Sequence, residues 1–135
     1  MNGAVRVSGE VLRYLAEQAR REPGIECCGL LAGSGGVISV ALPARNALAS
    51  STAYEIAPKE LFRLFRRIRE LGLDHLGIYH SHPATDNAPS PTDIERAFYP
   101  EAVYFIVSPR LEVPRPVRAF TIRNGAAREL TIVED

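Results

Sequence analysis

Residues 76–82 read Leu76-Gly77-Ile78-Tyr79-His80-Ser81-His82, an apolar, β-favouring run that ends in two histidines. This pattern predicts a buried strand, in which residues two apart project from the same face. The side chains of His80 and His82 are therefore expected to point toward one spot at the end of the strand.

A second motif, Ser90-Pro91-Thr92-Asp93, follows after a segment rich in turn formers. Serine with proline behind it is typical of a helix N-cap and first helical position, which places Asp93 in the first turn. The two imidazoles and this carboxylate can then hold one zinc ion. Three protein ligands leave the fourth tetrahedral position free for water, as in catalytic zinc sites, where the bound water has a pKa near ~7.

A base that takes the proton of this water is expected elsewhere in the chain. Glu26 is the candidate, because it opens the otherwise apolar, strand-like run from Cys27 to Gly33. A charged group seldom lies in such a position without a partner.

Together these residues resemble the JAMM (MPN-plus) metalloprotease family, whose motif is a glutamate, then His-x-His, seven residues, Ser, two residues and Asp. The matching positions are Glu26, His80, His82, Ser90 and Asp93, without a departure in spacing. The flanks are also similar: Glu-x-Cys-Gly-Leu-Leu-x-Gly around residue 26, Tyr-His-Ser-His-Pro around residue 80, and a following apolar strand over 102–108.

The resemblance implies a fold and a substrate class. The fold is α/β, a curved mixed β-sheet flanked by helices with the zinc at its edge, an architecture that is similar to cytidine deaminases. Enzymes of this family cut peptide or isopeptide bonds after the C-terminal Gly-Gly of ubiquitin-like proteins. The short form looks like the prokaryotic branch, and is similar to hydrolases that release cysteine from a ubiquitin-like sulfur-carrier protein. A deconjugase acting on modified lysines is the near alternative, and a catalytically silent scaffold is the alternative of another class.

The expected chemistry is metal-assisted amide hydrolysis. Zinc is held by His80, His82 and Asp93; Glu26 accepts the proton of the water, and the Ser90 hydroxyl helps to stabilise the oxyanion. Each residue also has a simpler interpretation: a strand histidine that contacts a carbonyl, an N-cap serine, or a first-turn acid. Asp86, in the loop between the motifs, is either a further ligand or a turn residue.

Hydrophobic periodicity predicts the remaining elements. Helices are expected from Ser8 to about Glu22, from Pro58 to Gly72 and from Pro91 to about Phe98. Strands are expected over residues 4–7, 27–32, 37–42, 54–56, 102–108, 116–122 and 127–133, in addition to the histidine strand.

Composition bounds the remaining possibilities. The chain has 135 residues, of which 46% are hydrophobic, and this predicts one domain over residues 1–135. The 16 basic and 16 acidic residues balance, so bulk charge gives no reason to propose nucleic acid. No apolar run approaches the ~20 residues of a membrane span, and a cytoplasmic location follows by default. An exposed apolar patch could serve a homodimer or a carrier protein equally well.

The two cysteines, Cys27 and Cys28, are adjacent and cannot chelate as a Cys-x-x-Cys pair. We interpret them as reduced, buried thiols. A zinc deaminase is disfavoured, because that class needs Pro-Cys-x-x-Cys downstream of its His-x-Glu and no cysteine follows position 28.

Overall fold

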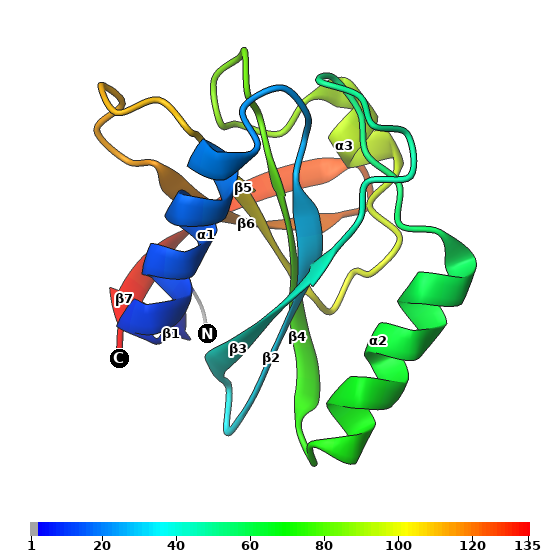
Figure 1. Ribbon diagram of the computed structural model, residues 1–135. Coiled ribbons are helices and arrows are strands. Elements are labelled where there is room, and N and C mark those ends of the chain that lie inside the picture. Colours follow the sequence, from blue (N-terminus) through cyan, green and yellow to red (C-terminus); the bar gives the residue numbers. More distant parts are fainter. Residues whose placement is uncertain (1–2) are drawn as a thin grey trace.

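The computed structural model describes residues 3–135, and in this range a curved sheet is flanked by helices (Figure 1). The three helices are α1 (Gly9–Arg21), α2 (Pro58–Glu70) and α3 (Pro91–Glu95). The seven strands are β1 (Ala4–Val7), β2 (Cys28–Ser34), β3 (Val37–Ala44), β4 (Asp74–Ser81), β5 (Val103–Val107), β6 (Val117–Arg123) and β7 (Ala126–Glu134).

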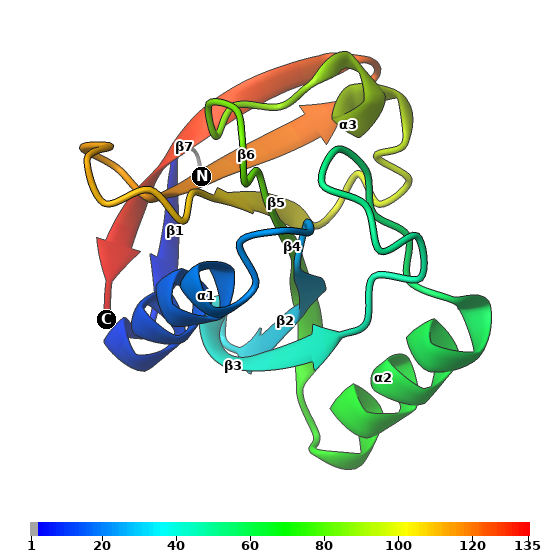
Figure 2. The same ribbon diagram turned by 45° about the horizontal axis from the view of Figure 1, so that its top comes forward.

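The sheet is mixed and closes into a barrel with the strand order β1-β3-β2-β4-β5-β6-β7 (Figure 2). β1 closes it, since this short strand pairs in parallel with both β3 and β7. The neighbours of β4 differ in direction: β2 is antiparallel to it and β5 is parallel. The predicted mixed sheet with flanking helices is therefore confirmed, and its closure is an addition that the periodicity did not predict.

The two faces of the sheet are covered by different helices, because side chains alternate along each strand. On β4, Tyr79 belongs to the cluster packed against α1, and Ile78 belongs to the cluster packed against α2. Both faces of the central strands are buried, which explains why β2 and β4 read as continuous apolar runs. His80 and His82 share the face of Ile78, so they lie on the α2 side of the sheet.

Local sequence sets the helix ends near the predicted positions. The Ser8 side chain accepts a hydrogen bond from the backbone N–H of Val11 and caps α1. Pro58 opens α2, and Gly72, with φ of 71°, follows the end of that helix in the left-handed conformation that glycine adopts most readily.

One predicted strand and two predicted boundaries are wrong. Residues 54–56 form no strand, because the Asn46 side chain and one backbone bond from Ala47 to Glu55 hold this segment in place of a ladder, as described below. The predicted third helix ends at Glu95 rather than near Phe98. β3 runs through Pro43 to Ala44 rather than ending at Leu42. Proline is tolerated there because this end of β3 pairs only with β2, while the pairing with β1 involves Val37 and Ile38 at the other end of the strand.

None of the helices in the described range is long and apolar enough to cross a membrane.

Candidate metal centre

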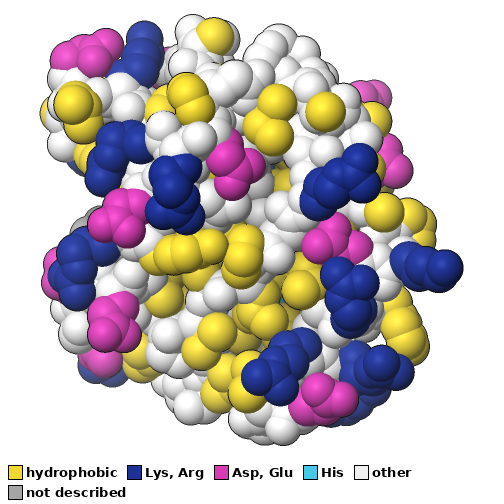
Figure 3. Space-filling model, viewed as in Figure 1, with side chains coloured by type: hydrophobic (Ala, Val, Ile, Leu, Met, Phe, Trp, Pro, Cys, Tyr) yellow, Lys and Arg dark blue, Asp and Glu magenta, His cyan; other side chains and the backbone are white. Residues whose placement is uncertain are grey.

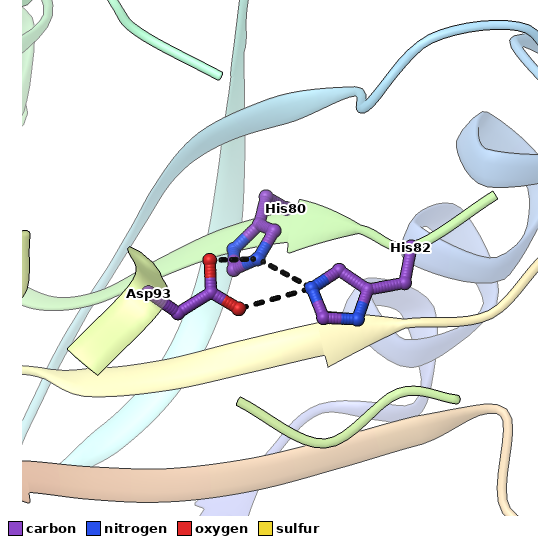
Figure 4. Close-up of side chains that lie close together, drawn as sticks. All are labelled: His80, His82 and Asp93. Carbon is purple, nitrogen blue, oxygen red and sulfur yellow. Dashed lines mark hydrogen bonds and ion pairs between the residues drawn. The ribbon is translucent and has the colours of Figure 1, made fainter. Parts of the chain in front are cut away.

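The end of β4 and the start of α3 bring three side chains together (Figure 4). His80 lies in β4, His82 follows that strand by one residue, and Asp93 lies in the first turn of α3. The two Nε2 atoms are 3.1 Å apart, and the Asp93 carboxylate lies 3.1 Å from His80 Nε2 and 3.0 Å from His82 Nε2. The structure thus brings together the three residues that the sequence proposes as ligands.

All three side chains are largely removed from solvent, with exposed fractions of 2% for His80, 4% for His82 and 10% for Asp93. Burial raises the energy of the Asp93 carboxylate, but the contacts with both histidines outweigh burial and hold its pKa far below the usual range. Burial lowers the pKa of His80. Burial also lowers the pKa of His82, but the hydrogen bonds with Asp93 and with the Asp86 carbonyl outweigh burial, so the pKa of His82 is raised.

The tautomer of His82 is set by its second ring nitrogen. Nδ1 lies 2.7 Å from the backbone carbonyl oxygen of Asp86, and this contact is favourable only if Nδ1 carries a hydrogen, because a carbonyl only accepts. In the neutral ring Nε2 then has a free lone pair directed at His80 and Asp93. This arrangement, in which a carbonyl holds the outer nitrogen, is the one that metal-ligating histidines use.

The donor set fits a divalent cation. A lone pair on His82 Nε2 and an ionised oxygen of Asp93 repel at 3.0 Å unless a positive charge, either a proton or a metal ion, lies between them. Tetrahedral zinc bonds of roughly 2.0–2.1 Å place neighbouring ligand atoms about 3.3 Å apart, close to the spacing of these donors. Two imidazoles and one carboxylate are also a ligand set that zinc accepts.

The Asp93 carboxylate is oriented by the cap of its own helix. Ser90 Oγ accepts from the backbone N–H of Asp93 at 3.1 Å, and Asp93 Oδ2 accepts from the backbone N–H of Ser90 at 2.9 Å. This reciprocal capping box fixes the carboxylate, so the N-cap interpretation of Ser90 is confirmed. The same bonds leave the hydroxyl hydrogen of Ser90 free to donate, because Oγ acts only as an acceptor in the cap.

Glu26 lies two residues before β2 and is 4% exposed. Its Oε1 atom is buried and finds no hydrogen-bond partner in residues 3–135. Burial raises the pKa of Glu26 to about 7; the charge of His82 lowers it and that of Asp93 raises it. A buried carboxyl group with a pKa near neutrality, within electrostatic reach of two of the candidate ligands, has the properties of a general base.

Asp86 serves the centre through its backbone rather than its carboxylate. Its carbonyl accepts from His82, and its side chain is 73% exposed and lies 3.7 Å from Arg118. The group of three donors within 4.8 Å of one another, in the described part of the chain, contains His80, His82 and Asp93. The turn interpretation of Asp86 therefore fits the geometry better than the ligand interpretation.

The two cysteines are free and buried, as predicted. Burial raises the pKa of Cys27 to about 11 and that of Cys28 to about 12, so both thiols stay protonated at neutral pH.

Two contributors near the centre have no signal in the sequence motif. The ring of Tyr54 stacks on the imidazole of His80 with a centroid distance of 4.5 Å and an interplanar angle of 21°. Asn46 is 3% exposed and bonds the segment that carries Tyr54. The composition of residues 43–52, with Pro43, Asn46 and the Ser50-Ser51-Thr52 run, indicates an irregular segment but not which residue holds it.

An apolar pocket of about 260 Å³ adjoins the candidate ligands. It reaches His80 and Asp93, and its other lining residues include Tyr54, Leu61, Phe98 and Tyr104. Figure 3 shows apolar side chains gathered along the middle of one face, with basic and acidic side chains around them and hardly any histidine surface. A substrate that reaches the candidate ligands from this pocket would therefore meet mainly apolar walls, with Glu55, Thr92 and Arg96 as the other polar members of the lining.

Comparisons with known proteins agree with this geometry. The family described as prokaryotic homologs of the JAB domain matches residues 8–123. A desampylase of Haloferax volcanii is 41% identical over 102 residues, 73% of each chain. A CysO-cysteine peptidase of Mycobacterium tuberculosis is 33% identical over 125 residues, which are 91% of this chain and 86% of the relative.

Solved structures show the same fold. A protein of Desulfitobacterium hafniense superposes with a TM-score of 0.81 at 30% identity, covering 97% of this chain and 92% of that one. A structure described as a JAMM metalloprotease-like zinc site of the proteasome and signalosome superposes with a TM-score of 0.62 at 20% identity, covering 97% and 99%. The peptidase relatives confirm the predicted class of enzyme, a hydrolase. The chain therefore belongs to the family of prokaryotic JAB-domain homologs, within the JAMM group that its motif resembles.

Proposed function

We propose that this protein is a zinc-dependent hydrolase that cleaves the bond after the C-terminal Gly-Gly of a ubiquitin-like protein. One observation carries the proposal: the two Nε2 atoms of His80 and His82 and the Asp93 carboxylate converge at 3.0–3.1 Å. Near them, burial raises the pKa of Glu26 to about 7. A ligand triad with a base of this kind suits hydrolysis of an amide at neutral pH.

His80, His82 and Asp93 would hold the zinc ion, which when bound supplies a water of pKa near ~7 and polarises the scissile carbonyl. Glu26 accepts the proton of the attacking water and returns it to the departing amine. Its pKa near 7 in the protein suits both transfers, although the charge of a bound cation lowers this pKa. Burial of Glu26 also keeps solvent from competing for the proton.

The Ser90 hydroxyl is the proposed donor to the oxyanion that develops on the carbonyl oxygen. Its hydrogen is free, because Oγ accepts from the Asp93 N–H in the helix cap. The cap also fixes the position of this hydroxyl relative to the ligand Asp93, which is the condition for preorganised stabilisation of charge.

The substrate class rests on the relatives. The CysO-cysteine peptidase matches over 91% of this chain, and the desampylase is 41% identical over a shorter range. We propose a ubiquitin-like sulfur-carrier protein with cysteine after its Gly-Gly as the first substrate to test, with release of free cysteine. Removal of a ubiquitin-like modifier from lysine is the second candidate, and the identity to the desampylase favours it.

The test is intact-mass spectrometry of two substrates incubated with the zinc-loaded protein. One is a sulfur-carrier protein that bears cysteine after Gly-Gly, and the other carries the same Gly-Gly linked to a lysine side chain. We expect loss of the cysteine or of the lysine-linked group, and no loss when a chelator is present or when the protein carries Glu26→Gln.

The controls separate the alternatives. Zinc bound at one ion per chain without cleavage of either substrate would refute the proposed hydrolysis and favour a silent scaffold. Cleavage of only the lysine-linked substrate would replace the first substrate by the second. Near-normal activity of Glu26→Gln would refute the role of that residue as base.

Four further points belong to the same proposal and remain to be tested: zinc as the metal, a single domain over residues 1–135, a cytoplasmic location, and whether an exposed apolar patch serves a homodimer or a carrier protein. Metal analysis of the purified protein and its mass in solution are the direct measurements of the first and the last.

A further inference from the structure

The two candidate histidine ligands are held in different ways. The outer nitrogen of His82 donates to the Asp86 carbonyl at 2.7 Å. The outer nitrogen of His80 is buried and has no hydrogen-bond partner among residues 3–135. Metal-ligating histidines almost always have such a partner, which fixes the orientation of the ring. Another contact must therefore orient His80.

The ring of Tyr54 provides that contact. It lies on the His80 imidazole with a centroid distance of 4.5 Å and an interplanar angle of 21°. A stacked ring prevents the imidazole from rotating about its bond to Cβ, because rotation would drive the ring edge into the Tyr54 face. The stack thus keeps His80 Nε2 directed at Asp93, 3.1 Å away.

Tyr54 itself lies in an irregular segment, so no ladder holds it. The side chain of Asn46 holds it instead, together with one backbone bond in which the Ala47 N–H donates to the Glu55 carbonyl at 2.8 Å. Asn46 Nδ2 donates to the carbonyls of Ala53 and Glu26, both at 3.0 Å, and Asn46 Oδ1 accepts from the backbone N–H groups of Leu48 and Glu55 at 3.0 and 3.2 Å. The bonded residues 53 and 55 are the two neighbours of Tyr54 in the chain.

The same segment fixes the backbone on both sides of the proposed base. The Glu26 carbonyl accepts from Asn46, and the Glu26 N–H donates to the carbonyl of Ser50 at 2.8 Å. Both backbone hydrogen-bonding groups of Glu26 are thus satisfied by residues 46–50. One asparagine therefore connects the residue that carries the base to the residue that orients His80.

We propose that Asn46 and Tyr54 are positioning residues of the metal centre: Asn46 clamps residues 46–55, and this clamp holds the Tyr54 ring against His80. The proposal rests on the proposed function only in that a metal ion binds at His80, His82 and Asp93. It adds two residues outside the recognised motif to the requirements of the site.

The test measures zinc affinity, by competition with a chromophoric chelator, for the wild-type protein and four variants. Asn46→Asp keeps the shape and the acceptor oxygen but loses the N–H donors, and its carboxylate faces the carbonyls of Glu26 and Ala53. Because partners that orient ligands typically contribute 10–100-fold to metal affinity, we expect Asn46→Asp and Tyr54→Leu each to weaken zinc binding by about 10–100-fold. Tyr54→Phe keeps the ring and should bind zinc within about twofold of wild type.

Gln18→Met is the matched control for loss of a buried amide. Gln18 is 3% exposed, like Asn46, and accepts from the Tyr79 hydroxyl at 2.6 Å on the opposite, α1 side of the sheet. This variant should lose stability to denaturant and keep zinc affinity. Rescue by Tyr54→Phe, together with an unaffected control, is a result that a general loss of stability would not produce.

Wild-type affinity in both Asn46→Asp and Tyr54→Leu would overturn the proposal, as would an equal loss in Gln18→Met. If Asn46→Asp does not fold, Tyr54→Leu decides alone, because the Asn46 clamp is intact in that variant. The assay contains no substrate, so a wild-type protein that binds zinc but cleaves nothing would refute the proposed hydrolysis and leave these affinity differences to support the positioning roles.

Discussion

Glu26→Gln should make the metal-free protein more stable at alkaline pH, and it should remove the activity of the zinc-loaded protein. The wild-type carboxyl group is buried, and burial raises its pKa from 4.5 to about 7. The folded state therefore binds more protons than the unfolded state between these two values. Stability falls as pH rises through this range and the loss is complete above pH 7, since the carboxylate must then be charged in a buried position. Glutamine has the same shape but no charge, so the Glu26→Gln protein does not lose this stability as the pH rises.

The magnitude follows from the size of the shift. A rise from 4.5 to about 7 corresponds to about 3 kcal/mol at 1.36 kcal/mol per pKa unit, which is an upper limit. Relaxation and screening by nearby solvent reduce it, so we expect Glu26→Gln to gain about 1–2 kcal/mol at pH 8. At pH 4 the wild-type carboxyl group is protonated in the folded state, and the gain should be close to zero.

The assay is urea unfolding of chelator-treated protein at pH 4, 6 and 8, followed by circular dichroism because the chain has no tryptophan. Glu17→Gln, on the exposed side of α1, is the matched control and should show no comparable gain. A gain for Glu26→Gln that does not change with pH, or a loss of stability at pH 8, would refute the account of Glu26 as a buried carboxyl group that is costly to ionise.

Three further predictions concern the site and the sheet. Ser90→Ala should lower turnover by about 10²–10³-fold, because the oxyanion donor is lost, and should lower stability by about 1 kcal/mol, because the helix cap is lost; zinc should stay bound. Unchanged turnover with a measurable loss of stability would show that Ser90 acts only as a helix cap. Chelation of the metal should abolish cleavage, and zinc should restore it; activity that persists after metal analysis shows none bound would contradict metal-assisted chemistry. Gly29→Ala should destabilise the protein by about 3 kcal/mol or more, since an added Cβ would lie against the Leu42 carbonyl and 2.6 Å from the Tyr79 ring. Gly24→Ala is the control and should cause no such loss, because a Cβ there meets nothing within 4 Å. Thermal unfolding of the two glycine variants measures the difference, and equal midpoints would show that β2 can shift to make room.

Much of the candidate site could be predicted because its residues obey local rules. The alternation of side chains along β4 places His80 and His82 on one face, and the serine-proline pair places Asp93 in the first turn of a helix. Neither rule needs knowledge of distant parts of the chain. The prediction of a strand over residues 54–56 is wrong for the same reason. The β-favouring residues of this segment obey the local rule, but its backbone bonds go to the Asn46 side chain and to the Ala47 N–H rather than to a neighbouring strand.

The sequence by itself determined the types of the candidate ligands, their faces and the helix that carries Asp93, since these depend on spacing within one element or across one loop. Tertiary structure alone decided which ring lies on His80, how the backbone of Glu26 is held, and that Glu26 is buried deeply enough for its pKa to rise to about 7. Each of these depends on contacts between residues far apart in the chain. The closure of the barrel depends on long-range pairing in the same way, because β1 at the start of the chain pairs with β7 at its end.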